Sequence, residues 1–159
     1  MTIAPLLVAA QVLAASSHLS VFEPVIGGCW QAEFSPTLND THCFEPVYGG
    51  AHVRDRHEVR QNGKTVYAGE TIYSDEGGRL VFTYFNSTGG VGGGTVAPVA
   101  AGLQFQGSMR ASPGKTPEAI NTEWRFTAPG TYEVRSMPDI TGSANPVLKF
   151  HRISDLQNR

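Results

Sequence analysis

The sequence lacks the features by which several functional classes are recognised. It contains no run of basic residues interleaved with aromatic ones, and its formal net charge is −2, so nucleic acid is not an expected partner. It also lacks the Gly-x-Ser-x-Gly motif of many hydrolases and the Gly-Lys-Ser/Thr ending of a phosphate-binding loop. The apolar run at its start is shorter than the roughly 20 residues that span a bilayer, so no transmembrane segment is expected.

Short segments of alternating apolar and polar residues make up most of the chain. The 159 residues suit one domain, and 18 glycines and 10 prolines indicate many turns and few long helices. Turn signals separate about eight to ten such segments, which predicts an all-β protein of antiparallel strands. Hairpin-like connections favour an up-and-down β-barrel over a sandwich, because closure leaves no exposed edge strand. We expect residues 16–159 to form this single barrel domain.

The first 15 residues form an apolar stretch without charged side chains. Residues 12–14 or 13–15 resemble a signal-peptidase site, because small residues stand near the cut, although no basic residue precedes them. The first interpretation, a signal peptide over residues 1–15, predicts a periplasmic or secreted protein; otherwise the protein is cytoplasmic. The alternative is a short N-terminal helix that packs on the domain through Leu6, Val8, Leu13 and Val21.

Cys29 and Cys43 are the only cysteines, and they lie near adjacent ends of the first two predicted strands. An even number of cysteines in an exported protein favours a disulfide, which would join these strands. In the cytoplasm both residues would be free thiols. Two cysteines at this spacing do not form a zinc signature.

Residues 52–73 are predicted to form one long β-hairpin. Asn62 and Gly63 stand at its centre, and both tolerate the positive φ angles of a two-residue type I′ turn. Such a turn fixes the register, so Asp55 should face Glu70. Because side chains alternate between the two faces of a strand, one mainly apolar face should point inward. The members of this face are Val53, Asp55, His57, Val59, Val66, Ala68, Glu70 and Ile72.

Two carboxylates on the inward face require an explanation, because opposed like charges destabilise a sheet and a buried carboxylate needs a partner. A shared proton, the imidazolium of His57, an arginine or a bound ligand could compensate Asp55 and Glu70. Two alternatives require no internal site. The pair could be solvated at the mouth of the barrel, or a β-bulge could turn one carboxylate outward.

The other strands contribute aromatic residues to the predicted interior. These residues either line a ligand cavity or fill the barrel. They are Trp30, Phe34, Phe105, Trp124, Phe126 and Tyr132. The strand over residues 79–86 has two open registers. In the first register, Val81, Thr83 and Phe85 point inward. In the second, Phe82, Tyr84 and Asn86 point inward, and Tyr84 lies opposite Glu70.

Three short motifs carry a family resemblance. They are the opening Ile26-Gly27-Gly28-Cys29-Trp30, a hairpin motif with Tyr67, Gly69, Glu70 and Tyr73, and a segment with Tyr84, Asn86, Ser87, Gly89 and Gly90. Over residues 22–153 the chain resembles calycin-type β-barrels, and it is most similar to bacterial lipocalin-like families of unknown function. The resemblance implies a small apolar or amphipathic ligand held in the barrel. Nitrobindin-like relatives bind heme through a histidine, but His151 shares a face with Lys149 and should face solvent, so no heme is predicted.

The leading hypothesis is a barrel that binds a small apolar or amphipathic molecule. The residues expected to line its site are Trp30, Asp55, His57, Glu70, Tyr84, Asn86 and Trp124. One alternative is a lyase or isomerase in which Asp55, His57 and Glu70 act as general acids and bases, because carboxyl groups in an apolar cavity have raised pKa values. Another is a structural or interaction domain with a filled core. The same three residues form a flat array without an evident fourth ligand, so neither a metal ion nor a cofactor is predicted.

Overall fold

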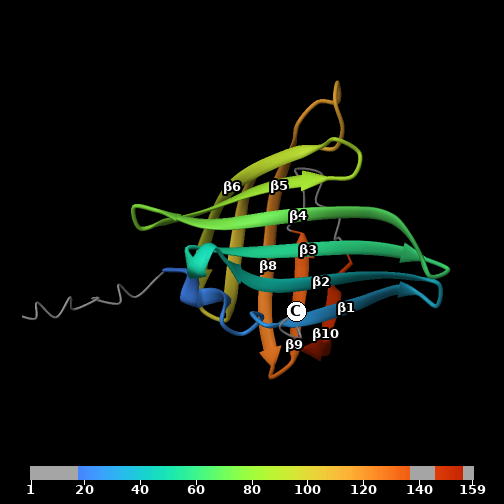
Figure 1. Cartoon of the computed structure of the whole chain (residues 1–159), viewed down its shortest axis with the longest axis horizontal. Coiled ribbons are helices and arrows are strands. Elements are labelled where there is room, and N and C mark those ends of the chain that lie inside the picture. Colours follow the sequence, from blue (N-terminus) through green and yellow to red (C-terminus); the bar gives the residue numbers. More distant parts are fainter. Residues whose placement is uncertain (1–17, 137–145, 156–159) are drawn as a thin grey trace, which may run out of the picture.

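The computed structural model describes residues 18–136 and 146–155 (Figure 1). The predicted signal peptide, residues 1–15, lies outside these ranges, as do Leu6, Val8 and Leu13 of the alternative helix. Two 3₁₀ turns are formed, η1 (His18–Phe22) and η2 (Tyr48–Gly50). The strands are β1 (Gly28–Ser35), β2 (Leu38–Val47), β3 (His52–Gln61), β4 (Lys64–Glu76), β5 (Arg79–Asn86), β6 (Val91–Val99), β7 (Gly102–Arg110), β8 (Glu118–Ala128), β9 (Thr131–Ser136) and β10 (Leu148–Asp155).

The strands form one closed antiparallel barrel. Each strand pairs with its neighbours in the sequence, and β1 pairs with β10 to close the sheet. This confirms the predicted all-β, up-and-down barrel. η1 lies at one end against β3, β4 and β5, and Figure 1 shows it in blue beside the β2–β3 connection. In the described ranges no helix is long and apolar enough to cross a membrane.

The turn between β3 and β4 forms at Asn62 and Gly63, whose φ angles are +52° and +76°, as a type I′ turn requires. The first two residue pairs beyond this turn follow the predicted register. A β-bulge comes next: Val59 pairs with Tyr67, and Val66 is the extra residue. Because side chains alternate with period two, the bulge moves every later residue of β4 to the opposite face of the sheet.

The predicted pairing of Asp55 with Glu70 is therefore wrong. Asp55 pairs with Thr71 and is 3% exposed, whereas Glu70 pairs with Arg56 on the outer face. There the Glu70 carboxylate lies 3.8 Å from the Arg54 guanidinium. This register is favoured because it turns tyrosines of β4 inward and leaves no second carboxylate opposite Asp55. The other residues of β4 that were predicted inward and turn outward are Val66, Ala68 and Ile72.

The inner faces of β5, β7, β8 and β9 are among those predicted from the alternation. Phe82 of β5 is buried, so the register that also turns Tyr84 and Asn86 inward is the correct one. Tyr84 pairs with Thr71 and not with the predicted Glu70. The buried residues on the predicted inner faces of β7, β8 and β9 are Leu103, Phe105, Trp124 and Tyr132.

Aromatic side chains fill the interior from η1 to the middle of the barrel. Phe22 of η1 stacks on Tyr73, with ring centroids 4.3 Å apart, and so closes this end. Trp30 and Trp124 are 1% and 6% exposed, so these two residues fill the barrel. Phe34 was predicted to point inward, but its side chain is 44% exposed. It lies where the register between β1 and β2 shifts. The buried aromatic residues are Phe22, Trp30, Phe44, Tyr73, Phe82, Phe105, Trp124, Tyr132 and Phe150.

Cys29 and Cys43 form a disulfide, as predicted for an exported chain. They occupy paired positions in β1 and β2, with Cα atoms 4.1 Å apart. Their neighbours Trp30 and Phe44 are buried inside, so alternation sets the disulfide on the outer face of the barrel. It links two strands next to the point where β1 closes the sheet with β10.

Candidate functional site

Solvent reaches the half of the interior that lies toward the β3–β4 turn. His57, Tyr67, Gly69 and Tyr84 belong to the inner face there, yet each is only partly buried. Partial exposure of inward-facing residues indicates unfilled space, and we call this part of the barrel the open half. Besides Gly69, the inward positions on its wall that have no side chain include Gly92, Gly94 and Gly107. The apolar inward residues near its rim are Leu38, Val59, Met109 and Ile120.

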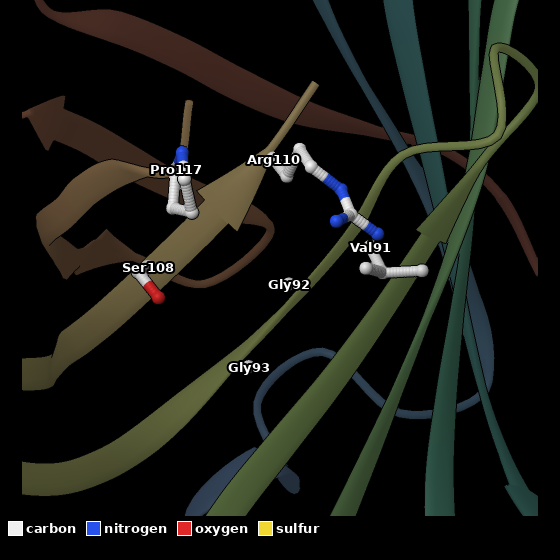
Figure 2. A pocket seen from close by; sticks show the side chains of 6 residues that line it. All are labelled: Val91, Gly92, Gly93, Ser108, Arg110 and Pro117. Atoms are coloured by element: carbon white, nitrogen blue, oxygen red, sulfur yellow. The ribbon is translucent and has the colours of Figure 1, made fainter. Parts of the chain in front are cut away.

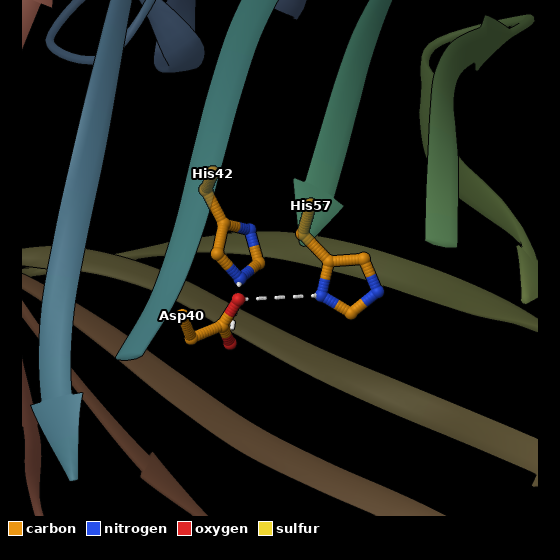
Figure 3. A group of neighbouring side chains, drawn as sticks. All are labelled: Asp40, His42 and His57. Carbon is orange, nitrogen blue, oxygen red and sulfur yellow. Dashed lines mark hydrogen bonds and ion pairs between the residues drawn. The ribbon is translucent and has the colours of Figure 1, made fainter. Parts of the chain in front are cut away.

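Four ionisable side chains meet at the bottom of the open half. Asp40 and His42 come from β2, and Asp55 and His57 come from β3; we call these four residues the polar cluster. The two residues of each pair are separated by one position, so both face the same side of their strand. His42 pairs with His57 across the two strands, which brings both pairs together inside the barrel. Figure 3 shows Asp40, His42 and His57 converging from β2 and β3.

His42 lies between two carboxyl groups. Its Nδ1 is 2.8 and 3.1 Å from the two oxygens of Asp55, and its Nε2 is 3.3 Å from Oδ2 of Asp40. Burial opposes the charge, but the negative charge of Asp55 and the hydrogen bonds to both carboxylates outweigh it and raise the pKa of His42 to about 10. The ring is therefore an imidazolium at neutral pH and donates to both sides.

Asp40 is held in its ionised form. Burial alone would raise the pKa of this carboxyl group, but the hydrogen bond with His42, the positive charge of that ring and the nearby His57 lower it well below its ordinary value. Its Oδ1 lies 3.7 Å from Nδ1 of His57, which is too long for a hydrogen bond. Asp40 therefore lies between the two histidines and is hydrogen-bonded to His42 but not to His57.

A line of polar groups continues from His57 toward the open half. Nε2 of His57 is 3.1 Å from the hydroxyl of Tyr84, which is 2.5 Å from the hydroxyl of Tyr67. Burial, together with Tyr67, raises the pKa of Tyr84 above its ordinary value, so this phenol stays protonated. Gly69 makes the arrangement possible, because a Cβ atom there would lie closest to His57 Nε2 and 2.8 Å from Cε2 of Tyr84.

In the part of the chain that the structure describes, three buried polar atoms of this region have no hydrogen-bond partner: Asp40 Oδ1, His57 Nδ1 and the hydroxyl of Tyr132. Tyr132 is 1% exposed, and its ring stacks on Phe150, which in turn meets the ring of His42 edge-on. Burial raises the pKa of Tyr132 well above its ordinary value, and the charges of the two aspartates of the cluster act in the same direction. Unpartnered buried groups are uncommon in proteins, and each one calls for an occupant or a function.

The structure separates the predicted site residues. Asp55 and His57 belong to the polar cluster, and Tyr84 continues it, whereas Glu70 lies on the outer face with its side chain 40% exposed. Asn86 organises the β5–β6 turn, where its Oδ1 accepts hydrogen bonds from the backbone N–H groups of residues 88 and 90. The two tryptophans predicted to line the site are packed in the filled half. His151 is exposed, as predicted.

Asp40, His42 and Tyr67 were not among the site residues predicted from the sequence. A signal for the first two was present, because Asp-x-His occurs twice, at residues 40–42 and 55–57, on strands that are neighbours in sequence. Two such repeats on paired strands bring four ionisable groups to one face. Tyr67 had no comparable signal, because the bulge beside Val59 determines which way it points.

Two hollows border other parts of the sheet. One, of about 280 Å³, lies beside β6 and β7, where Figure 2 shows the side chain of Arg110 reaching toward Val91. It contains no residue of the polar cluster. The other runs along β1 to β5, largely on their outer side, and reaches His57, Gly69 and Asn86 of the inner face.

Comparison with protein-family models gave no match, and comparison with curated protein sequences gave no significant match. The closed barrel is compatible with the calycin-type architecture that the motifs resemble. Any assignment of function therefore depends on the geometry of the barrel interior.

Proposed function

We propose that this protein is a lipocalin-like binding barrel of the calycin type that holds a small amphipathic molecule in its open half. The observation that carries this proposal is the division of the interior. Aromatic rings fill the half next to η1, whereas inward-facing residues of the other half stay partly exposed. A ligand would enter the open half and stop above the polar cluster, because the rings of Trp30 and Trp124 already occupy the space below it.

The polar end of the ligand would point inward, toward His57, Tyr67 and Tyr84. The two hydroxyls and the imidazole can each donate or accept a hydrogen bond. A neutral or cationic head group fits better than an anionic one, because the cluster contains two carboxyl groups. Among the described residues, the only lysine or arginine at an inward register position of the open half is Lys64, which is exposed at the tip of the β3–β4 hairpin. The apolar part of the ligand would contact the rim residues Leu38, Val59, Met109 and Ile120.

A second candidate function is acid–base catalysis. It is favoured by the line of polar groups from Asp55 through His42, Asp40 and His57 to Tyr84 and Tyr67, because such a line can move a proton between a bound molecule and the cluster. An isomerase or lyase would convert the ligand, whereas a carrier would release it unchanged. Mass spectrometry of metabolite mixtures after incubation separates the two: conversion by the wild type and not by Asp40→Asn would favour the enzyme.

We also propose that the protein is exported to the periplasm or secreted. The disulfide between Cys29 and Cys43 supports this location, because disulfides persist in oxidising compartments and are rare in the cytosol. Cell fractionation with an antibody against the protein tests the proposal. Recovery in the cytosolic fraction with both thiols free would contradict it.

Calorimetric titration with matched amphipathic probes tests the binding proposal. We expect metal-free protein to bind 1-octanol and octylamine and to bind octanoate much more weakly, because only octanoate has an anionic head. Since a buried methylene contributes about 0.8 kcal/mol, 1-octanol should bind about tenfold more tightly than 1-hexanol. Absence of binding by every probe, or equal binding of octanoate and octanol, would contradict the proposal.

A tyrosine variant locates the head group. Tyr84→Phe removes a hydroxyl and should weaken 1-octanol binding about tenfold, the effect of one hydrogen bond of roughly 1.4 kcal/mol. Tyr48→Phe is the matched control, because Tyr48 is 82% exposed in η2 at the other end of the barrel. Native mass spectrometry of freshly purified wild type would identify a natural ligand that co-purifies.

A further inference from the structure

We propose that Asp40, His42 and His57 bind a divalent transition-metal ion, with Asp55 orienting His42. This site does not depend on the binding of an amphipathic molecule. Each of the three residues offers one ligand atom, and these atoms lie within 4.8 Å of one another at the bottom of the open half (Figure 3). No metal ion was predicted from the sequence, because His57 was grouped with Asp55 and Glu70, and Asp40 and His42 were not considered.

The spacing of the donor atoms fits one small ion. Ligand atoms at about 2.1 Å from a tetrahedral Zn²⁺ ion are about 3.4 Å from each other. Here, Nε2 of His42 lies 3.3 Å from Oδ2 of Asp40, and Nδ1 of His57 lies 3.7 Å from its Oδ1. These contacts involve different oxygens of Asp40, and the three donor atoms lie within 4.8 Å of one another, so side-chain rotations would have to bring the two nitrogens and one carboxylate oxygen to coordination distance.

A second observation indicates an occupant at the same place. Asp40 is 8% exposed, and its Oδ1 and the nearby Nδ1 of His57 are buried without a hydrogen-bond partner among the described residues. Leaving a buried polar atom unsatisfied costs about 1–3 kcal/mol. A cation between these two atoms would satisfy both, whereas moving the rings to form a direct hydrogen bond would disturb the contact of His57 with Tyr84.

The surrounding contacts orient both histidines for coordination. Asp55 is 3% exposed and accepts a hydrogen bond from Nδ1 of His42, which directs Nε2 of that ring toward the proposed ion. Binding of the ion would displace the Nε2 proton that is shared with Asp40 in the metal-free protein, and this proton would be released to solvent. Histidines that bind metals usually donate their other ring N–H to such a carboxylate. In His57 the roles are reversed: the tautomer protonated at Nε2 donates to Tyr84 and has its lone pair on Nδ1. Asp55 is thus a positioning residue.

The donor set selects the class of ion. Two imidazole nitrogens and one carboxylate suit Zn²⁺, Fe²⁺ or Co²⁺, whereas Mg²⁺ and Ca²⁺ prefer oxygen ligands. All three ligands come from β2 and β3, on one wall of the barrel, so the remaining coordination positions face the open half. Three protein ligands with an open position are typical of metal sites that also bind a small molecule.

Metal titration of the untagged, disulfide-bonded protein after chelator treatment tests the site. We expect one Zn²⁺ ion to bind per chain, and one Co²⁺ ion to bind with visible absorption bands that Zn²⁺ abolishes. His57→Gln and His42→Gln should each weaken Zn²⁺ binding at least 100-fold. Asp55→Asn, which keeps all three ligands, should weaken it about 10- to 100-fold. The matched control is His151→Gln, which replaces an exposed histidine of β10 and should leave the affinity unchanged.

Several outcomes would overturn the proposal. They are the absence of binding of one ion per chain, affinities of His57→Gln and Asp55→Asn within threefold of the wild type, or an equal loss in His151→Gln. Circular dichroism establishes that each variant is folded; if His42→Gln does not fold, the other two variants decide. The octanol titration uses metal-free protein, so a failure of metal binding leaves the proposed binding function untouched, and the reverse also holds.

Discussion

Gly69→Ala tests whether the contact between His57 and Tyr84 holds the open half together. Gly69 lies on the inner face of β4, where it pairs with His57 of β3 and with Asn86 of β5. An added Cβ atom would lie closest to His57 Nε2 and 2.8 Å from His57 Cδ2 and Tyr84 Cε2. Because a normal carbon contact is about 3.5–4.0 Å, both rings would have to move by roughly 1 Å, and their 3.1 Å hydrogen bond would break.

The expected loss of stability combines two effects. Overpacking costs typically 1–3 kcal/mol, and the lost hydrogen bond adds about 1 kcal/mol, so Gly69→Ala should lower the free energy of unfolding by about 2–4 kcal/mol. Urea denaturation followed by tryptophan fluorescence measures the change. The control is the same substitution in a His57→Ala background, which removes the nearest atoms and should reduce the cost of the added methyl group by more than half. An equal cost in both backgrounds would show that His57 is not what Gly69 accommodates.

Three further predictions concern the rest of the molecule. Replacing Cys29 and Cys43 with serine should lower the free energy of unfolding by about 3 kcal/mol in urea, because the disulfide closes a loop with a sequence separation of 14 residues. The folded pKa of His42, about 10, lies above its unfolded value of 6.5, so this group stabilises metal-free protein fully below pH 6.5. That contribution should decline from pH 6.5 to 10, as thermal unfolding would detect, and a flat profile would contradict it. Asp55→Asn should destabilise the protein by about 3–5 kcal/mol at pH 7, whereas Glu70→Gln should change stability by less than about 1 kcal/mol.

Much of the fold is encoded in features that a single strand or turn reveals. Alternation identifies the inner faces of β7, β8 and β9, because each strand has one apolar side. Asn62 and Gly63 identify their turn, because both tolerate a positive φ angle. The disulfide also follows from local information, since Cys29 and Cys43 lie on consecutive strands.

The candidate site depended on information that one strand does not contain. The bulge at Val66 reverses the face of β4, and nothing in the adjacent residues distinguishes it from a regular ladder. It therefore removed Glu70 from the interior and brought in Tyr67. Asp40 was missed for a different reason. Its partner His57 is 17 positions away in the sequence, and only the pairing of β2 with β3 brings them together.

The polar cluster is poorly explained as a device for stability. Replacing buried ion pairs by apolar residues of similar volume is often neutral or stabilising, so a sequence selected for stability alone has little reason to keep four ionisable groups inside a barrel. The cluster also does not end within the filled core. It continues through Tyr84 and Tyr67 toward solvent, and it leaves Asp40 Oδ1 and His57 Nδ1 without partners on that route. A purely structural network would satisfy those atoms first, because they carry the highest cost when unpaired. Their position at the boundary between filled and open space is what a site for a ligand or an ion requires.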